Sequence, residues 1–218
     1  INKKTNKWNT SVLIIISLTQ LFLTSMVLGI IFFDFKIGSS PFIMLRDAVT
    51  APIFQLNPDF IPENGTGLNI LLQNYWMVIH PPTLFLGFSI CLIPFAYAIS
   101  ALRLSDFRGW ILPAKKWLIY SIIVLGIGIM MGAYWAYETL KFGGYWNWDP
   151  VENAVYVPWL FLVASLHSII LAQKNKKYIT TSLILSILSF ILILYSTFLT
   201  RSGILGDSSV HSFTDLGL

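Results

Sequence analysis

The chain has 218 residues, of which 56% are hydrophobic and only 11% are charged. A water-soluble domain of this size usually carries about a quarter charged residues, so the composition excludes an ordinary soluble protein and indicates an integral membrane protein. The formal net charge of +4 does not indicate a nucleic-acid-binding surface, because the basic residues form short clusters between apolar runs, as membrane topology requires.

The first residue, the recurring apolar runs and the single cysteine further restrict the class of protein. The chain begins with Ile1 and apolar runs recur along its whole length, so we expect a single membrane domain, 1–218, that is a fragment of a longer protein. Cys91 is the only cysteine, which excludes an internal disulfide and any Cys-x-x-Cys motif.

Five apolar runs are long enough to cross a membrane as helices, which takes about 20 residues. They lie roughly at Val12–Phe33, Leu84–Leu102, Trp117–Trp135, Ala154–Ala172 and Ile179–Leu199. None shows the alternation of a strand, so the sequence predicts an all-α fold, a multi-pass transmembrane helix bundle of about five spans. Gly128 and Gly132 form a Gly-x-x-x-Gly pair in the third run, which favours close packing against another helix.

The basic residues predict which side of the membrane each connection faces. Ten of the 14 lysines and arginines fall on the side of the amino end, so the positive-inside rule places that end in the cytoplasm. The outer side then holds a loop at 34–82, a Trp-rich loop at 134–159 and the segment 201–218. We expect a bacterial inner membrane, with an organelle membrane as the alternative.

The chain has three histidines, two of them predicted on the outer side. His80 precedes Pro81 and Pro82, which favour a first helical turn, so its ring is expected at a helix amino end whose dipole favours the neutral, metal-binding form. His211 follows the fifth run, and either outer histidine is alternatively a solvated interface residue. His167 lies within the fourth run, where it binds a ligand or a neighbouring helix.

Aromatic residues dominate the connection between the third and fourth runs. An interfacial belt of Trp and Tyr explains their presence but not their density. A flat aromatic platform beside Gly143 and Gly144, with two histidines on the same side, suits a planar macrocycle that has a metal at its centre. The run from Asp149 through Pro150 to Glu152 has a second interpretation, as a variant capping box at the start of the fourth helix.

These residues resemble a known family, the Trp-rich ("WWD") haem-handling proteins of cytochrome c biogenesis, and within it the CcmF/NrfE branch of haem lyases. The resemblance rests on Gly143-Gly-Tyr-Trp-Asn-Trp-Asp-Pro-Val-Glu-Asn153, whose ending is more similar to this branch than to the CcsA branch. Tyr145 stands where the signature often has Trp. Further matching segments are Ile79–Gly87, Ala133–Tyr137, Pro158–Leu160, Leu166–Ser168, Phe198–Gly203 and Val210–Phe213.

The resemblance implies two haem b sites. His80 and His211 would ligate the iron of an outer haem, and His167 would be one axial ligand of an intramembrane haem whose second ligand lies in a later helix. The outer haem would be bound by residues of the Trp-rich loop and its flanks: Trp135, Tyr145, Trp146, Trp148, Asp149, Glu152 and Trp159.

The activity implied by the resemblance is that of a haem lyase within a complex. It joins the haem vinyl groups to the two thiols of a Cys-x-x-Cys-His motif in an apocytochrome c. The implied partners are a CcmE-like haem chaperone that delivers haem, a CcmH-like subunit that handles the apocytochrome, the apocytochrome c itself and membrane lipid. Two alternatives stay open, namely a haem transporter or relay without ligation activity and a non-catalytic docking subunit.

Overall fold

The computed structural model describes residues 3–33, 35–38, 40–48, 50–61, 63–64, 67, 70–139 and 144–209. Its long helices are α1 (Lys3–Leu28), α4 (Tyr75–Leu104), α5 (Ile111–Thr139), α6 (Pro150–Lys174) and α7 (Ile179–Arg201). The short elements are strands β1 (Ile30–Phe32) and β2 (Phe35–Ile37), helices α2 (Leu45–Ala48) and α3 (Pro52–Leu56), and the 3-10 helices η1 (Ile70–Leu72), η2 (Lys176–Tyr178) and η3 (Gly206–Ser208).

Five segments are long and apolar enough to cross a membrane: Lys7–Leu28, Tyr75–Leu104, Ile111–Thr139, Pro150–Lys174 and Lys176–Arg201. The predicted all-α, multi-pass membrane fold is therefore confirmed. The helices extend beyond the apolar runs, so the ranges 34–82 and 134–159 contain the start of α4, the end of α5 and the start of α6. The antiparallel hairpin of β1 and β2 was not predicted, because three-residue strands are too short to show an alternating pattern.

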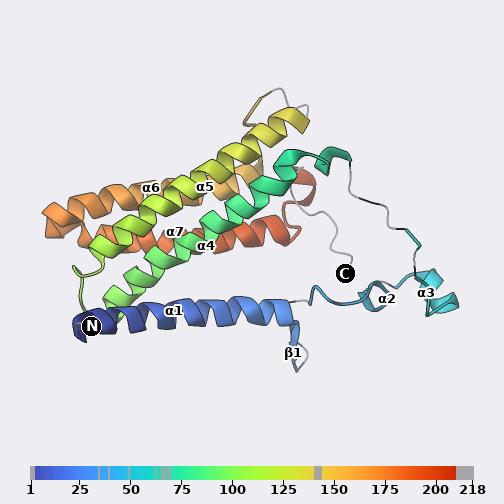
Figure 1. Cartoon of the computed structure of the whole chain (residues 1–218), viewed down its shortest axis with the longest axis horizontal. Coiled ribbons are helices and arrows are strands. Elements are labelled where there is room, and N and C mark those ends of the chain that lie inside the picture. Colours follow the sequence, from blue (N-terminus) through green and yellow to red (C-terminus); the bar gives the residue numbers. More distant parts are fainter. Residues whose placement is uncertain are drawn as a thin grey trace.

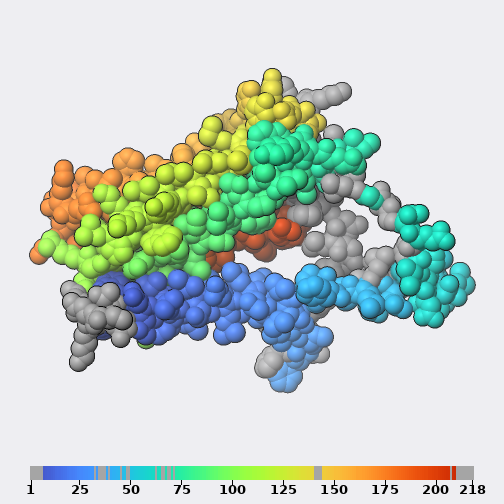
Figure 2. All heavy atoms as spheres, viewed as in Figure 1, coloured from blue at the N-terminus to red at the C-terminus, as the bar shows by residue number. Residues whose placement is uncertain are grey.

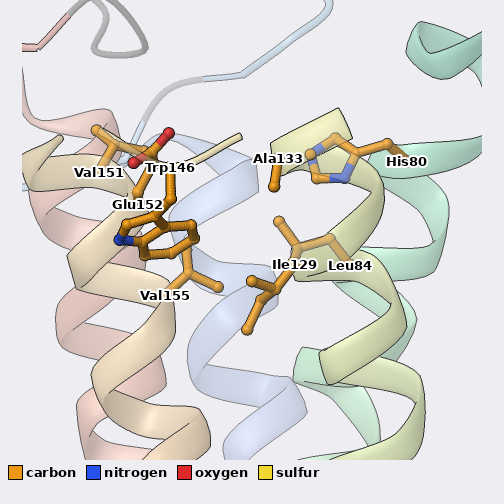
Figure 3. Close-up of a pocket in the computed structure, with 9 residues that line it drawn as sticks. His80, Leu84, Ile129, Ala133, Trp146, Val151, Glu152 and Val155 are labelled. Carbon is orange, nitrogen blue, oxygen red and sulfur yellow. The ribbon is translucent and has the colours of Figure 1, made fainter. Parts of the chain in front are cut away.

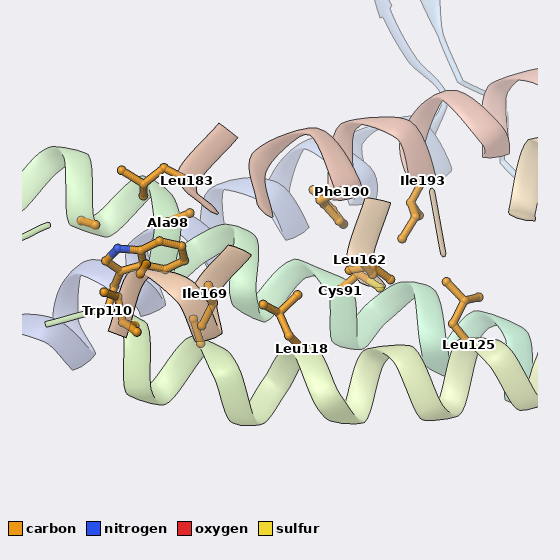
Figure 4. Close-up of a cluster of buried hydrophobic side chains, with 14 of the residues drawn as sticks. Cys91, Ala98, Trp110, Leu118, Leu125, Leu162, Ile169, Leu183, Phe190 and Ile193 are labelled. Carbon is orange, nitrogen blue, oxygen red and sulfur yellow. The ribbon is translucent and has the colours of Figure 1, made fainter. Parts of the chain in front are cut away.

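Helices α4 to α7 form a four-helix bundle, in which α4 packs on α5 and α7, and α6 packs on the same two helices. Helix α1 contacts α4 but lies outside this bundle, and the segment from β1 to η1 extends away from it (Figures 1 and 2). The bundle core is apolar and runs along its whole length, from Trp110 at one end to Leu125 and Ile193 at the other (Figure 4).

Serines line the interface between α6 and α7. Ser165 and Ser186 share a hydrogen bond of 2.7 Å between their hydroxyls, and Ser182 and Ser189 are also buried. Small side chains let two membrane helices approach closely, and hydroxyls bond across the interface or back to the helix. The amino-terminal half of α7 is thereby held against the second half of α6.

Glycines allow a similarly close approach of α4 and α5. A Cβ atom built on Gly87 would lie 2.8 Å from the Cα of Leu125, and one on Gly128 would lie 3.0 Å from the Cα of Leu84. These distances are shorter than side-chain contacts normally are, so both positions require glycine. The close packing predicted for the Gly-x-x-x-Gly pair is confirmed, and α4 is the partner helix.

Replacing Gly87 by alanine should push α4 and α5 apart, because the new methyl group meets backbone rather than a movable side chain. We expect the free energy of unfolding to fall by about 1–3 kcal/mol, measured as a lower thermal unfolding midpoint of the detergent-purified protein. Gly144→Ala is the matched control, since nothing lies within 4 Å of its added methyl group. Equal effects of the two substitutions would contradict a role for the close helix contact.

Candidate functional site

The Trp-rich segment ends in a capping box at the start of α6. Asp149 is the N-cap and accepts the Val151 N–H at 2.8 Å, while Glu152 accepts the Asp149 N–H at 3.3 Å and the Asn147 N–H at 3.1 Å. Pro150 occupies the first helical position, where its missing N–H costs nothing. The capping interpretation of these two carboxylates is confirmed.

The cap determines where the adjacent tryptophans point. Trp148 has a φ of +56°, a left-handed conformation that is unusual for a large residue, and its carbonyl accepts the Asn153 side-chain N–H at 2.8 Å. Trp148 is consequently 68% exposed, whereas Trp146 is half-buried against Tyr156, with ring centroids 5.4 Å apart. One signature tryptophan therefore faces inward and the other faces outward.

His80 lies in the second turn of α4, and not before it as the sequence predicted. The helix begins earlier because the Asn74 side chain accepts the Trp76 N–H and caps it. Pro81 and Pro82 consequently fall inside the helix, where each removes a main-chain hydrogen bond. The expected position at the helix amino end is wrong, and so is the argument from the helix dipole.

Contacts with α5 orient the His80 ring instead. Its Nδ1 lies 2.8 Å from the carbonyl oxygen of Gly128, and since a carbonyl only accepts, Nδ1 carries the proton and the lone pair is on Nε2. A Cβ atom on Gly132 would lie 2.7 Å from Cε1 of His80, so this glycine makes room for the ring. Trp135 lies against the other side, with its ring centroid 5.9 Å from that of His80.

His80 borders two adjoining cavities. The first has a volume of about 100 Å³, and in it His80 and Trp146 lie on opposite walls, with Glu152 beside the tryptophan (Figure 3). The second, of about 180 Å³, reaches Arg201 at the end of α7. Both are mainly apolar, and they share His80, Leu84, Val151 and Val155. An apolar lining with few polar groups is typical of small-molecule sites.

A second aromatic group lies at the carboxyl end of α5, apart from these cavities. Tyr145 stacks on Tyr137, with centroids 4.2 Å apart and ring planes 16° from parallel, and Trp76 packs edge-on to Tyr134. The Trp76 indole N–H donates to Glu138 at 2.7 Å. The predicted single aromatic platform is thus divided, because Tyr145 and its neighbour in sequence, Trp146, belong to different groups.

The remaining predicted residues have other surroundings. Trp159 packs in the bundle, where its indole N–H donates to the carbonyl oxygen of Ile122 on α5 at 3.0 Å. His167 is exposed on the outside of α6, with Nδ1 2.8 Å from the carbonyl oxygen of Val163. His211 lies outside the described residues. Ser209, the last residue described, donates its hydroxyl to Asp149 at 2.7 Å.

Sequence reasoning missed two parts of this site. The Gly-x-x-x-Gly pattern predicts close packing but not that Gly128 faces Leu84 and Gly132 faces His80, because any two residues four apart share that spacing. Arg201 is predicted on the outer side and lies in the matching segment Phe198–Gly203, but no role of its own is predicted for it. It lines the second cavity, and its guanidinium carbon lies 5.9 Å from the ring centroid of Phe85.

Comparison with known proteins gives consistent matches. The family described as "Cytochrome C assembly protein" matches residues 2–205. CcmF of Pseudomonas aeruginosa, a cytochrome c-type biogenesis protein, is 39% identical over 178 residues, which are 80% of this chain and 26% of that protein. NrfE of Haemophilus influenzae, also a cytochrome c-type biogenesis protein, is 37% identical over 188 residues, 86% of this chain and 28% of that protein.

One solved structure is also similar. A protein named "Cytochrome c Heme Lyase CcmF" superposes with a TM-score of 0.55 at 39% sequence identity, over 62% of this chain and 23% of that one. The chain spans about a quarter of the length of the curated relatives it matches.

Replacing Glu152 by alanine removes the acceptor for two main-chain N–H groups. We expect a loss of about 1 kcal/mol in the free energy of unfolding and a change in the near-ultraviolet circular dichroism, since Trp148 lies between the two released groups and Trp146 directly precedes them. Glu63→Ala is the control, because that carboxylate is exposed and lies in the segment that extends from the bundle. An unchanged spectrum with Glu152→Ala would show that the cap does not orient the tryptophans.

Proposed function

Because this chain belongs to the cytochrome c assembly protein family, we propose that it presents haem on the outer face of the membrane for covalent attachment to an apocytochrome c. In that reaction a thiol S–H of the Cys-x-x-Cys-His motif adds across each haem vinyl group, so a C–S bond forms and nothing leaves. The protein supplies position and iron ligation, while the addition chemistry belongs to haem and thiol.

The observation that carries this proposal is the setting of His80. Its Nδ1–H donates to the Gly128 carbonyl, which fixes the ring and leaves Nε2 as the metal-binding nitrogen. The same ring borders an apolar cavity whose opposite wall is the indole of Trp146. An imidazole and an aromatic face across an apolar space are what a substrate haem requires.

His211 is the proposed second ligand of the outer haem. Ser209 is hydrogen-bonded to Asp149 in the α6 cap, and two further residues extend at most about 7 Å. Ser209 thus brings the chain to the α6 cap two residues before His211 in the sequence. The apocytochrome's own histidine would then replace one of the two imidazoles, which helps to release the product.

Arg201 is the proposed partner of the haem propionates. Among the described residues it is the only basic side chain that lines either cavity, and a guanidinium suits carboxylate groups because it offers paired donors. Glu152 would repel a propionate, but its carboxylate already accepts two N–H groups of the cap. The cavity wall near Trp146 therefore favours the apolar part of the macrocycle.

His167 is the proposed axial ligand of a resident haem b within the membrane. The donor fits, because its Nδ1 lies against the Val163 carbonyl and Nε2 is again the metal-binding nitrogen, on the exposed outer side of α6. The family resemblance implies that the second ligand would come from a later helix of the full protein. When bound, such a haem would carry electrons that help keep the substrate iron reduced.

The proposed setting is the bacterial inner membrane, with the amino end inside and the Trp-rich segment on the periplasmic side. A CcmE-like chaperone would deliver haem to the cavities beside His80. A CcmH-like subunit would present the apocytochrome thiols at the exposed Trp148 side. Membrane lipid surrounds the exposed apolar faces of the helices.

The two haem assignments can be tested separately. We expect His167→Ala to abolish a stable b-type signal in reduced-minus-oxidised spectra of the full-length protein, and His80→Ala with His211→Ala to abolish binding of chaperone-delivered haem only. Gly132→Ala should weaken the outer site at least tenfold, because its methyl group displaces the His80 ring. Gly144→Ala is the matched control. Unchanged haem content in every variant would refute the ligand assignments, and haem binding without covalent cytochrome c would favour a transporter.

The assignment of Arg201 predicts a difference between two substitutions. Arg201→Gln should weaken binding of haem at the outer site about tenfold, since charged hydrogen bonds contribute about 1.5–3 kcal/mol each. Arg201→Lys should retain most of the affinity, and the dimethyl ester of haem should bind the wild type and Arg201→Gln equally. Equal loss of haem and its diester in Arg201→Gln would assign this side chain to packing against Phe85.

A further inference from the structure

A cavity at the opposite end of α4 is independent of the haem site. It has a volume of about 560 Å³ and lies between the start of α1 and the end of α4, where Lys7, Ser11, Ile14 and Arg103 are among its lining residues. Since 23 residues of α4 separate Arg103 from His80, the two sites are about 35 Å apart along the helix. We propose that this cavity binds the phosphate headgroup of an anionic phospholipid.

Charge is the first argument. Lys7 and Arg103 are exposed cations on different helices, no carboxylate lines the cavity, and neither cation forms an ion pair within the described part of the chain. The nearest acid in sequence, Asp106, accepts the N–H groups of Arg108 and Gly109 in its own loop. Basic pockets between membrane helices on the cytoplasmic side are typical sites for lipid phosphates.

A buried hydroxyl is the second argument. Ser11 is only 3% exposed, lines the cavity, and has no hydrogen-bond partner for its Oγ among the described residues. Thr19 on the same helix shows the usual alternative, since its hydroxyl donates to the Ile15 carbonyl at 3.0 Å. A buried hydroxyl without a partner is destabilising, and a phosphate or ester oxygen in the cavity would accept its hydrogen bond.

The pattern along α1 distinguishes a lipid from free phosphate. Lys7, Ser11, Ile14, Leu18 and Leu21 follow at spacings of three or four, so they share one face of the helix. That face changes from a cation through a hydroxyl to exposed apolar side chains. Helices α1 and α4 are in contact near Trp8 and Tyr97, and from this contact toward the carboxyl end of α1 they diverge (Figure 1). The headgroup of a phospholipid would contact the cation and the hydroxyl, and its acyl chain would lie along the apolar side chains. Inorganic phosphate would contact only the polar part of this face.

The test uses the full-length protein in detergent and native mass spectrometry with phosphatidylglycerol, phosphatidylcholine or inorganic phosphate. We expect Lys7→Gln with Arg103→Gln to lower phosphatidylglycerol affinity about 30-fold, and Ser11→Leu to lower it about tenfold by filling the cavity without changing charge. Lys115→Gln with Lys116→Gln removes the same charge elsewhere on this side and should change the affinity less than threefold. Thermal unfolding in zwitterionic detergent checks that each variant folds.

Three results would overturn the proposal. Equal loss in both double variants would mean a general attraction of anionic lipid to a basic surface. Equal affinity for phosphatidylcholine would mean an apolar groove without headgroup recognition. Full displacement of phosphatidylglycerol by inorganic phosphate at millimolar concentration would identify a free-anion site.

Discussion

The close contact between α4 and α5 is the constraint on which the candidate site depends. An imidazole can lie between two packed helices only where the facing residue has no side chain, and Gly132 provides that space next to His80. The Gly128 carbonyl then accepts the Nδ1 proton at 2.8 Å, so the spacing that brings the helices together also sets the tautomer. The packing of α4 on α5 and the orientation of the His80 ring are therefore determined by the same two glycines.

The capping box determines what the carboxylates of Asp149 and Glu152 contact. A carboxylate beside an apolar cavity would ordinarily disfavour an anionic ligand, yet Glu152, like Asp149, points its oxygens at main-chain N–H groups. These hydrogen bonds occupy the carboxylate oxygens at the helix end. In the proposed function, recognition is left to the imidazole, the indole of Trp146 and the guanidinium of Arg201.

Much of the fold was predictable because its signals are local. Apolar length predicted the five helices, and the order Asp-Pro-x-Glu predicted the α6 cap, which involves residues only three apart. The start of α4 was not predictable from its prolines, because Asn74 caps the helix six residues before His80. The separation of Tyr145 from Trp146 depends on stacking with Tyr137 across a chain reversal, and no pattern within the segment encodes it.

The length of α6 decides whether His80 and His167 could bind the same iron. Glu152 lies beside the cavity that His80 borders, and His167 is 15 residues further along the same helix. At a rise of 1.5 Å per residue this is about 22 Å, far beyond the reach of two axial ligands of one iron. His167 also faces outward, whereas His80 faces into the bundle. In the proposed function the two imidazoles therefore serve separate sites, and any exchange between those sites would be of electrons or of a moving haem.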